Sequence, residues 1–172
     1  MTITRLFTPL DLFNVNMINL DQYTENYNIK FYLEHLGRWP DICIVEENAW
    51  GNIVGYHLGK VEGEVDQWHG HVTAISVSPF YRRMGLGEKL MKYARDISEL
   101  NGGNFVDLYV RVSNRAGIGM YESLGYIVYR HIIGYYAEGE DAYDMRLALS
   151  RDRDKKSVIP LKHSVKAEDV VT

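Results

Sequence analysis

Two arginines and two glycines stand directly before a helix-like run in the segment YRRMGLGEKL, residues 81–90. A helix begins with backbone N–H groups that lack an internal acceptor, and the positive end of the helix dipole favours bound anions there. Glycine has no β-carbon and lets a ligand approach the backbone closely. Arg82, Gly85 and Gly87 therefore indicate an anion site to which Arg83 adds charge, although a simple turn before a helix explains the same glycines equally well.

Closely spaced histidines form a second group of candidates. His69, His71 and Thr73 share one face of a strand, where an imidazole and a hydroxyl can hydrogen-bond an acidic or amide side chain. A structural histidine is the alternative, stronger for His69 than for His71. Two histidines can also bind zinc, but no third ligand follows at a usable spacing, so we expect no metal. Cys43 lies in the apolar run ICIVEE, which predicts an inert buried thiol.

Apolar spacing predicts the elements that must position these residues. Four helices are expected, at residues 8–20, 28–39, 85–100 and 114–125, and Ser113 or Asn114 caps the last one. Seven strands are expected, at residues 3–7, 41–47, 52–62, 69–78, 105–112, 126–136 and 141–149. Strands that pair through hairpins and then alternate with helices predict an α/β fold, in which helices cover a mixed sheet.

Length and composition indicate one domain and a tail. A chain of 172 residues, 46% of them hydrophobic, can bury one core, which we place at residues 1–149. Residues 150–172 have scattered charges and no aromatic side chain. We expect this segment to be a tail that is mobile or laid on a surface.

Charge and cysteine content argue against several classes of protein. The net charge is −4 and no run of five like charges occurs, which disfavours direct binding of nucleic acid. The single cysteine cannot form an internal disulfide and suits a reducing compartment. No apolar stretch approaches the roughly 20 residues that span a bilayer, and the first residues lack a signal-peptide pattern. We expect a soluble cytoplasmic protein that does not contact membranes.

The segment ISVSPFYRRMGLGEKLM resembles the acetyl-CoA signature of the GCN5-related N-acetyltransferases (GNAT), because Arg82, Gly85 and Gly87 match its spacing without a gap. The resemblance implies the GNAT fold, a central, mostly antiparallel mixed sheet of about seven strands with about four flanking helices. It implies that acetyl-CoA is the co-substrate, and that its pyrophosphate binds Arg82 and the backbone N–H groups of Arg83, Met84, Gly85, Leu86, Gly87 and Glu88. It also implies that the pantetheine arm runs along Ile75, Ser76 and Val77, with an N–H near Val77 facing the thioester oxygen.

The segment RVSNRAGIGMYESLGY resembles a later motif of the same family. The resemblance implies that Asn114 and Tyr121 belong to the catalytic and cofactor site, with Tyr121 near the cofactor sulfur. A phenol with a pKa near 10 can return a proton to a thiolate whose conjugate acid lies near 8.5, so we expect Tyr121 to act as general acid. A helix cap is an equal alternative for Asn114, and core packing is the alternative for Tyr121.

Residues 1–161 resemble, more narrowly, the catalytic subunits of N-terminal acetyltransferases, and most of all the B type (NatB). The stretches that carry this resemblance are NLDQYTENYNIKFYLEHLGRWPD, WHGHVTAISV, VDLYVRVSN, GYYAEGEDAYDMR and SRDRDKKSVIPL. Because ENY, HGH, SNRA and YYAEGEDAY also occur in A-type subunits, the B-type interpretation depends on NLDQYTENYNIKFYLEHL, MYESLGY and the tail.

The B-type resemblance implies a substrate and a partner. The substrate is the α-amine of a nascent chain that begins with Met followed by Asp, Glu, Asn or Gln. The partner is a large helical-repeat auxiliary subunit that brings the catalytic subunit to the ribosome. Apolar residues near the N-terminus, around Leu12, Phe13, Ile18 and Phe31, fit either a core or that interface. The resemblance further implies substrate contacts from Glu25, Tyr27, His71, Thr73, Ala74, Gly134, Tyr135 and Tyr136.

An α-amine places modest demands on its enzyme. With a pKa near 8, about a tenth of it is neutral at pH 7, whereas a lysine near 10.4 is almost wholly protonated. A weak base or a water relay therefore suffices, and Glu25 in YTENY is the best carboxylate for it, with a solvated loop acid as the alternative. Neighbouring strand residues point opposite ways, so we expect at most one of Tyr135 and Tyr136 to contact substrate through its hydroxyl.

These features together predict direct acetyl transfer within a ternary complex, without a covalent intermediate on Cys43. Two rival interpretations share the fold: an A-type N-terminal acetyltransferase and a lysine acetyltransferase. A third rival is a noncatalytic acyl-CoA-binding module.

Overall fold

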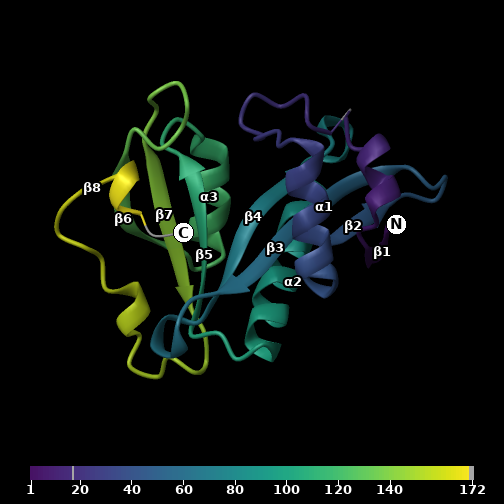
Figure 1. The fold of residues 1–172 in the computed structure, drawn as a ribbon. Helices are drawn as coiled ribbons and strands as arrows, with labels where there is room; N and C mark the ends of the chain where they lie inside the picture. Colours follow the sequence, from purple (N-terminus) through teal and green to yellow (C-terminus); the bar gives the residue numbers. More distant parts are fainter. Residues whose placement is uncertain (17, 171–172) are drawn as a thin grey trace. The chain divides into compact units, whose positions relative to one another are not determined.

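The computed structural model describes residues 1–16 and 18–170. The described residues form eight strands, in the hydrogen-bonded order β1-β2-β3-β4-β5-β7-β6-β8. The strands are β1 (Ile3–Leu6), β2 (Ile44–Glu47), β3 (Ile53–Glu62), β4 (His69–Val77), β5 (Phe105–Arg111), β6 (Ile127–Ile133), β7 (Ala142–Ala148) and β8 (Val165–Lys166). The α-helices are α1 (Ile29–Arg38), α2 (Leu86–Leu100) and α3 (Arg115–Ser123), and Figure 1 labels all of these elements.

The α/β prediction and the seven expected strands are confirmed, and β8 is an additional strand. The pairs β1–β2, β2–β3, β5–β7 and β6–β7 are antiparallel, while β6 and β8 are parallel. Backbone contacts divide the chain into two compact units. Unit 1 contains residues 1–61 and 72–97, and unit 2 contains residues 62–71 and 98–170 of the described chain. No helix in residues 1–16 or 18–170 is long and apolar enough to cross a membrane.

The core of unit 1 lies between α1 and the strands β2 and β3. Tyr32 and Leu36 of α1 pack with Val45 of β2 and with Tyr56 and Leu58 of β3. The N-terminus of α1 is capped by Asn28, whose side chain accepts a hydrogen bond from the Phe31 N–H at 2.8 Å. This cap fixes the start of α1 directly after the loop that contains two candidate substrate residues, Glu25 and Tyr27.

The helix expected at residues 8–20 is wrong. Among residues 8–16 and 18–20, which the structure describes, only a short 3-10 helix forms, η1 (Pro9–Phe13), and turns follow it. The Asp11 side chain accepts hydrogen bonds from Arg5 at 2.8 and 2.9 Å and from the Thr8 N–H at 2.8 Å. The Asn14 N–H then closes the turn on the Asp11 carbonyl at 2.9 Å. Asparagines follow, and their side chains compete with a helical backbone, so apolar spacing alone misleads here.

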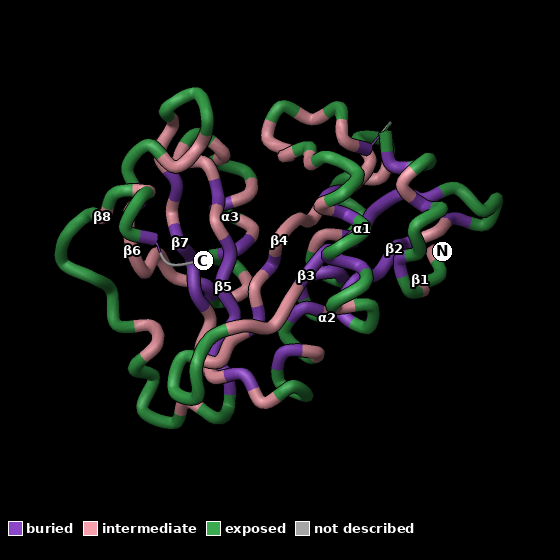
Figure 2. Tube along the Cα trace, in the orientation of Figure 1, coloured by how far each residue is buried: buried purple, intermediate pink, exposed green. Residues whose placement is uncertain are grey.

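Unit 2 is built around β7, which pairs with β5 on one side and β6 on the other. Met145, Ile132 and Ala142 are fully buried, and Figure 2 shows β5 and β7 as largely buried strands. Residues 150–170 lie on this unit: the Leu161 N–H donates to the Tyr129 carbonyl at 2.8 Å, and β8 pairs with the end of β6. Residues 171 and 172 of the expected tail lie outside the described residues.

Candidate active site

The turn between β4 and α2, in unit 1, exposes a row of backbone donors. A 3-10 helix, η4 (Pro79–Tyr81), follows β4, and the chain then takes left-handed conformations at Arg83 (φ 62°) and Gly85 (φ 79°). The first α-helical bond of this region runs from the Lys89 N–H to the Gly85 carbonyl at 3.0 Å. Within the described chain, the N–H groups of residues 83–88 donate to no acceptor. Such a row of donors at a helix N-terminus is suited to an anion.

Arg82 is held beside this turn by an acid that the sequence motif does not mark. Its guanidinium donates to the Asp21 carboxylate through Nη2, and its Nε lies 3.5 Å from the Val77 carbonyl. Asp21 also accepts the Tyr23 N–H at 2.7 Å, which fixes the carboxylate. Arg82, Arg83 and Met84 remain exposed, and Gly85 has open space where a β-carbon would stand.

The loop at residues 21–28 runs along β4, also in unit 1. Thr24 Oγ1 lies 3.3 Å from Ser76 Oγ, and the Tyr27 hydroxyl donates to the Thr73 carbonyl at 3.4 Å. The Thr73 hydroxyl is buried and has no hydrogen-bond partner in the described chain. A buried polar atom without a partner usually marks a place for water or a ligand.

The remaining candidates of unit 1 are placed by the same elements. Tyr27 stacks on Phe31, with ring centroids 4.2 Å apart, and Glu25 is half-buried in the loop. Ala74, Ile75 and Val77 of β4 are half-buried, and Ser76 is buried. At the start of α2, Leu86 is buried, Gly87 is half-buried and Glu88 is exposed.

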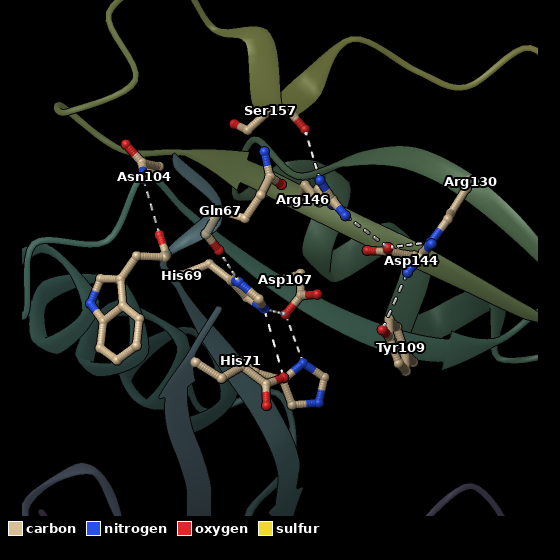
Figure 3. Close-up of polar contacts among 12 residues, drawn as sticks. Gln67, His69, His71, Asn104, Asp107, Tyr109, Arg130, Asp144, Arg146 and Ser157 are labelled. Atoms are coloured by element: carbon tan, nitrogen blue, oxygen red, sulfur yellow. Dashed lines mark hydrogen bonds and ion pairs between the residues drawn. The ribbon is translucent and has the colours of Figure 1, made fainter. Parts of the chain in front are cut away.

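In unit 2, His71 is oriented by a buried carboxylate that we did not foresee. Asp107 of β5 is 3% exposed, and its Oδ1 accepts a hydrogen bond from His71 Nδ1 at 2.7 Å, whereas His71 Nε2 points away from it (Figure 3). Burial by itself would raise the pKa of Asp107, but the charges of His71, His69 and Arg146 lower that pKa below the ordinary aspartate value. An acid inside the apolar strand FVDLYVR was the available sequence signal.

His69 occupies a different environment from His71. Its ring stacks on Phe105, with centroids 4.6 Å apart and an interplanar angle of 4°. Nδ1 lies 2.6 Å from the Gln67 carbonyl, and Nε2 lies 3.6 Å from Asp107 Oδ1 and 3.8 Å from Glu62 Oε1. His69 is therefore a hydrogen-bonded histidine that also faces two carboxylates, and Glu62 is a neighbour that spacing along one strand did not reveal.

A tyrosine cluster follows His71 in unit 2. Tyr109 of β5 lies edge-on to His71 and to Tyr135, with centroids 5.2 and 5.0 Å apart, and Tyr135 lies 5.1 Å from Tyr136. The Arg111 guanidinium lies over the Tyr136 ring at 4.0 Å. Burial raises the pKa of Tyr109, so its hydroxyl stays protonated. Tyr109 was absent from the residues expected from the sequence.

The loop that carries the tyrosine pair is shaped by Gly134. This residue has φ 64°, and its N–H donates to Asp141 Oδ1 at 2.8 Å. Behind the cluster, Arg130 donates to Asp144 at 2.8 Å and to the Tyr109 hydroxyl at 3.5 Å (Figure 3). Burial and the nearby Asp107 charge raise the pKa of Asp144 to about 6. These contacts hold Tyr109 and the strands around it in one arrangement.

The start of α3 places the last two candidates, also in unit 2. Asn114 is the N-cap, and its Oδ1 accepts the Gly117 N–H at 3.0 Å, so the capping alternative is observed, whereas the ligand role stays a prediction. Tyr121 is 7% exposed, and burial raises the pKa of its hydroxyl to about 12. That hydroxyl makes no hydrogen bond with the described residues, so its proton is not committed to a protein acceptor.

Comparison with known proteins decides the family. Residues 12–126 match the family model described as "Acetyltransferase (GNAT) family". The chain belongs to the GNAT acetyltransferase family. The matched range contains the Arg82–Gly87 turn and Tyr121 of this acetyltransferase, so the GNAT fold and the acyltransferase class expected from the sequence are confirmed.

The relatives of this GNAT chain carry names that are more specific than the family description. It is 50% identical over 171 residues, covering 99% of this chain and 98% of the relative, to the N-terminal acetyltransferase B complex catalytic subunit NAA20 of Arabidopsis thaliana. It is 52% identical over 170 residues, 98% of each chain, to N-alpha-acetyltransferase 20 of Dictyostelium discoideum. The crystal structure of Chaetomium thermophilum Naa20 with a bisubstrate analogue superposes with a TM-score of 0.94, at 37% identity over 99% of this chain and 100% of that one.

Proposed function

We propose that this GNAT chain is the catalytic subunit of a B-type N-terminal acetyltransferase. It transfers acetyl from acetyl-CoA to the α-amine of chains that begin with Met followed by Asp, Glu, Asn or Gln. The observation that carries the proposal is the row of unpaired N–H donors at residues 83–88, beside Arg82, in a chain about half identical to B-type catalytic subunits. The row supports cofactor binding, and the kinship supports the substrate class.

The residues of the β4–α2 turn fit the diphosphate of acetyl-CoA. The N–H groups of residues 83–88 donate to no acceptor among the described residues, Gly85 leaves open space at its α-carbon, and Arg82 supplies a guanidinium. Asp21 competes with an anion for Arg82, so the backbone donors are expected to contribute most of the binding and Arg82 the remainder. When bound, acetyl-CoA supplies an acyl group activated as a thioester. The half-buried β4 residues Ile75 and Val77 flank the path expected for its pantetheine arm.

Proton transfer is assigned to two side chains, Tyr121 of unit 2 and Glu25 of unit 1. Tyr121 is expected to donate its proton to the departing thiolate, because its raised pKa keeps it protonated at neutral pH and no described protein acceptor holds that proton. Glu25 is expected to accept a proton from the α-amine, directly or through water, and its half-buried position in the 21–28 loop permits this. Asn114, already engaged as a cap, is expected to support the turn that precedes Tyr121.

Recognition of the second substrate residue is assigned to His71 of unit 2, and Thr73 of unit 1 is a separate candidate for the same role. Asp107 fixes the His71 ring and favours a positive charge on it, which suits an acidic partner. The buried Thr73 hydroxyl lacks a partner in the described chain and can hydrogen-bond a carboxylate or an amide. The family resemblance assigns peptide contacts to residues of each unit: Tyr27 and Ala74 in unit 1, and Gly134, Tyr135 and Tyr136 in unit 2.

The proposal includes an auxiliary subunit. Leu10, Phe13 and Leu20 are 73%, 73% and 72% exposed, and Ile29 and Leu33 of α1 are 61% and 45% exposed. Large apolar side chains exposed together are typical of a surface that binds a partner protein. This supports binding of the auxiliary subunit of a B-type complex at η1 and α1. Ribosome association through that subunit and a cytoplasmic location belong to the same proposal, because nascent chains are the expected substrate.

A peptide panel tests the substrate class. Peptides that begin Met-Asp, Met-Asn, Ser and Ala, and one blocked at its N-terminus but carrying lysine, are assayed with acetyl-CoA with and without the auxiliary subunit. We expect the highest kcat/KM on the two Met-initiated peptides. Preference for Ser or Ala would support an A-type enzyme, and preference for the blocked peptide a lysine acetyltransferase. Acetyl-CoA binding by calorimetry with no acetylated product would support a noncatalytic module.

A further inference from the structure

Three side chains of unit 2 that can bind a metal lie together where β3 ends and β4 begins. Glu62 is the last residue of β3, and His69 and His71 are the first and third residues of β4. One ligand atom from each lies within 4.8 Å of the other two. Because the hairpin between the strands returns Glu62 to the histidines, a third ligand is present that spacing along β4 alone could not reveal.

The chemistry of the His69 ring favours a cation at this point. Its Nδ1, 2.6 Å from the Gln67 carbonyl, must carry a hydrogen to donate to that oxygen. In a neutral imidazole, Nε2 then presents a lone pair, yet it faces a carboxylate oxygen of Asp107 at 3.6 Å (Figure 3). A carboxylate oxygen of Glu62 lies 3.8 Å from the same nitrogen. A metal ion bound between these atoms would accept the Nε2 lone pair and carboxylate oxygen atoms together.

We propose that Glu62, His69 and His71 bind a divalent transition metal ion, best zinc. Asp107 lies outside this group of three, and a shift of its carboxylate would make it the fourth ligand. Zinc bonds of about 2.0–2.2 Å at tetrahedral angles separate ligand atoms by about 3.4 Å. The His69 Nε2 distances to Asp107 and Glu62, 3.6 and 3.8 Å, are close to that separation. The 2.7 Å contact between His71 Nδ1 and Asp107 Oδ1 must lengthen, which a rotation of the part-exposed His71 ring can supply.

The site is accessible and its ligands are oriented. The His69 and Glu62 side chains keep 14% and 26% of their surface exposed, so an ion can enter from solvent. The Gln67 carbonyl orients His69, and stacking on Phe105 fixes its ring plane. A hydrogen bond to the ring nitrogen that does not bind the ion raises the affinity of a histidine ligand for metal. The buried Asp107 supplies negative charge that the ion would neutralise.

On the proposed function, metal binding here would inhibit acetyl transfer. The ion would take His71 Nδ1 and Asp107 Oδ1 from each other and so remove the arrangement proposed to recognise the second substrate residue. Zinc is therefore expected to raise the KM for Met-Asp peptides and to leave acetyl-CoA binding unchanged. The ion is an inhibitor in this proposal, and the transfer reaction does not use it.

Cobalt spectroscopy of the full chain, with its auxiliary subunit if required for solubility, tests binding without measuring activity. One equivalent of Co²⁺ should give the intense visible absorption of tetrahedral coordination, and Zn²⁺ should displace it. His69→Gln and Glu62→Gln should each weaken Co²⁺ binding at least about tenfold, because loss of a residue that only orients a ligand already costs about 10–100-fold. His163→Gln, which removes an exposed histidine elsewhere, should bind Co²⁺ like the wild type. Equal affinity of the His69 and His163 variants, or no tetrahedral spectrum, would overturn the site.

Steady-state kinetics test separately whether zinc inhibits acetyl transfer. Zinc should raise the KM for a Met-Asp peptide in the wild type and in His163→Gln, and a chelator should reverse this. The His69→Gln enzyme should resist the same zinc concentration. A tetrahedral cobalt site with no zinc effect on KM would overturn inhibition and leave the binding site supported. If no peptide is acetylated at all, the proposed function fails while the cobalt result still decides whether the metal site exists.

Discussion

Tyr121 holds its proton more firmly than a tyrosine in water, because burial raises its pKa to about 12. The shift suits a general acid, since the group is fully protonated when a thiolate leaves. The same burial limits what the residue can do, because a phenol that rarely ionises is a poor base. The residue therefore fits proton donation, and the proton that the amine loses must go elsewhere, for which Glu25 is the candidate.

Replacing Tyr121 by Phe removes the donated proton and keeps the ring. We expect kcat for a Met-Asp peptide to fall about 100-fold or more, the usual contribution of a positioned general acid, with little change in acetyl-CoA affinity. Because the pKa is about 12, the wild-type kcat should show no loss caused by Tyr121 ionisation until the pH approaches that value. Steady-state rates across pH measure both. Tyr143→Phe, a matched change on β7, should keep kcat, and an unchanged kcat in Tyr121→Phe would remove the residue from the mechanism.

Asp107 is expected to act on substrate only through His71. Asp107→Asn keeps an acceptor for the His71 Nδ1–H but removes the charge that favours imidazolium. The KM should rise about tenfold for Met-Asp peptides, as loss of a charge-assisted contact implies, and less for Met-Asn peptides, whose amide needs no positive charge. Kinetics on the two peptides measure the difference. Equal losses on both would indicate a general structural defect, which thermal unfolding of the variant would reveal.

At the scale of elements, the β4–α2 turn combines a strand end, two left-handed residues and a helix N-terminus. Each part has a separate physical role: β4 supplies residues along the expected cofactor path, the turn aims N–H groups outward, and α2 supplies the dipole. Pro79 in η4 fixes where β4 must stop, because proline cannot donate to a neighbouring strand. The turn is therefore sensitive to backbone conformation more than to side-chain volume.

Gly85→Ala tests that sensitivity. A β-carbon at Gly85 meets no atom within 4 Å, so its cost comes from φ 79° alone, about 1–2 kcal/mol for a left-handed non-glycine residue. We expect a lower Tm and a higher KM for acetyl-CoA, because the donors are redirected. Gly119→Ala is the matched control: it lies in α3, also has nothing within 4 Å, and should be neutral or stabilise the helix by about 0.5–1 kcal/mol. Equal behaviour of the two variants would contradict the role of the turn.

The sequence predicted the elements whose signals are local. The strands and the helices α1, α2 and α3 follow apolar periodicity with caps and glycine stops, and the Arg82–Gly87 spacing located the turn. The sequence analysis failed where side-chain contacts and strand pairing decide the structure. Arg5 binds Asp11 in place of the expected first helix, and β8 pairs with the edge of β6. Asp107, Tyr109 and Glu62 were missed for the same reason, since only strand pairing brings them to the histidines.

At the scale of the whole molecule, the described chain forms two compact units. Unit 1 holds the turn proposed for the cofactor and the apolar surface proposed for the partner. Unit 2 holds His71, the tyrosine cluster and the C-terminal segment. Val170 closes a small core with Ile132 and Ala142, and Tyr109, Tyr135 and Tyr136 pack against that core. The C-terminal segment is therefore linked through packing to the loop proposed to cover the peptide.

Val170→Ala should loosen that loop without touching any proposed substrate contact. Val170 is 9% exposed, and loss of its two methyl groups should cost about 1–2 kcal/mol of folding free energy, read as a lower Tm. Because Tyr135 and Tyr136 rest on this core, the KM for Met-Asp peptides should rise severalfold, while acetyl-CoA affinity, which we propose comes mainly from the β4–α2 turn, should not change. Lys162→Ala, an exposed change in the same segment, should alter neither quantity. A peptide KM that stays constant while the Tm falls would show that the C-terminal segment stabilises unit 2 without shaping its substrate loop.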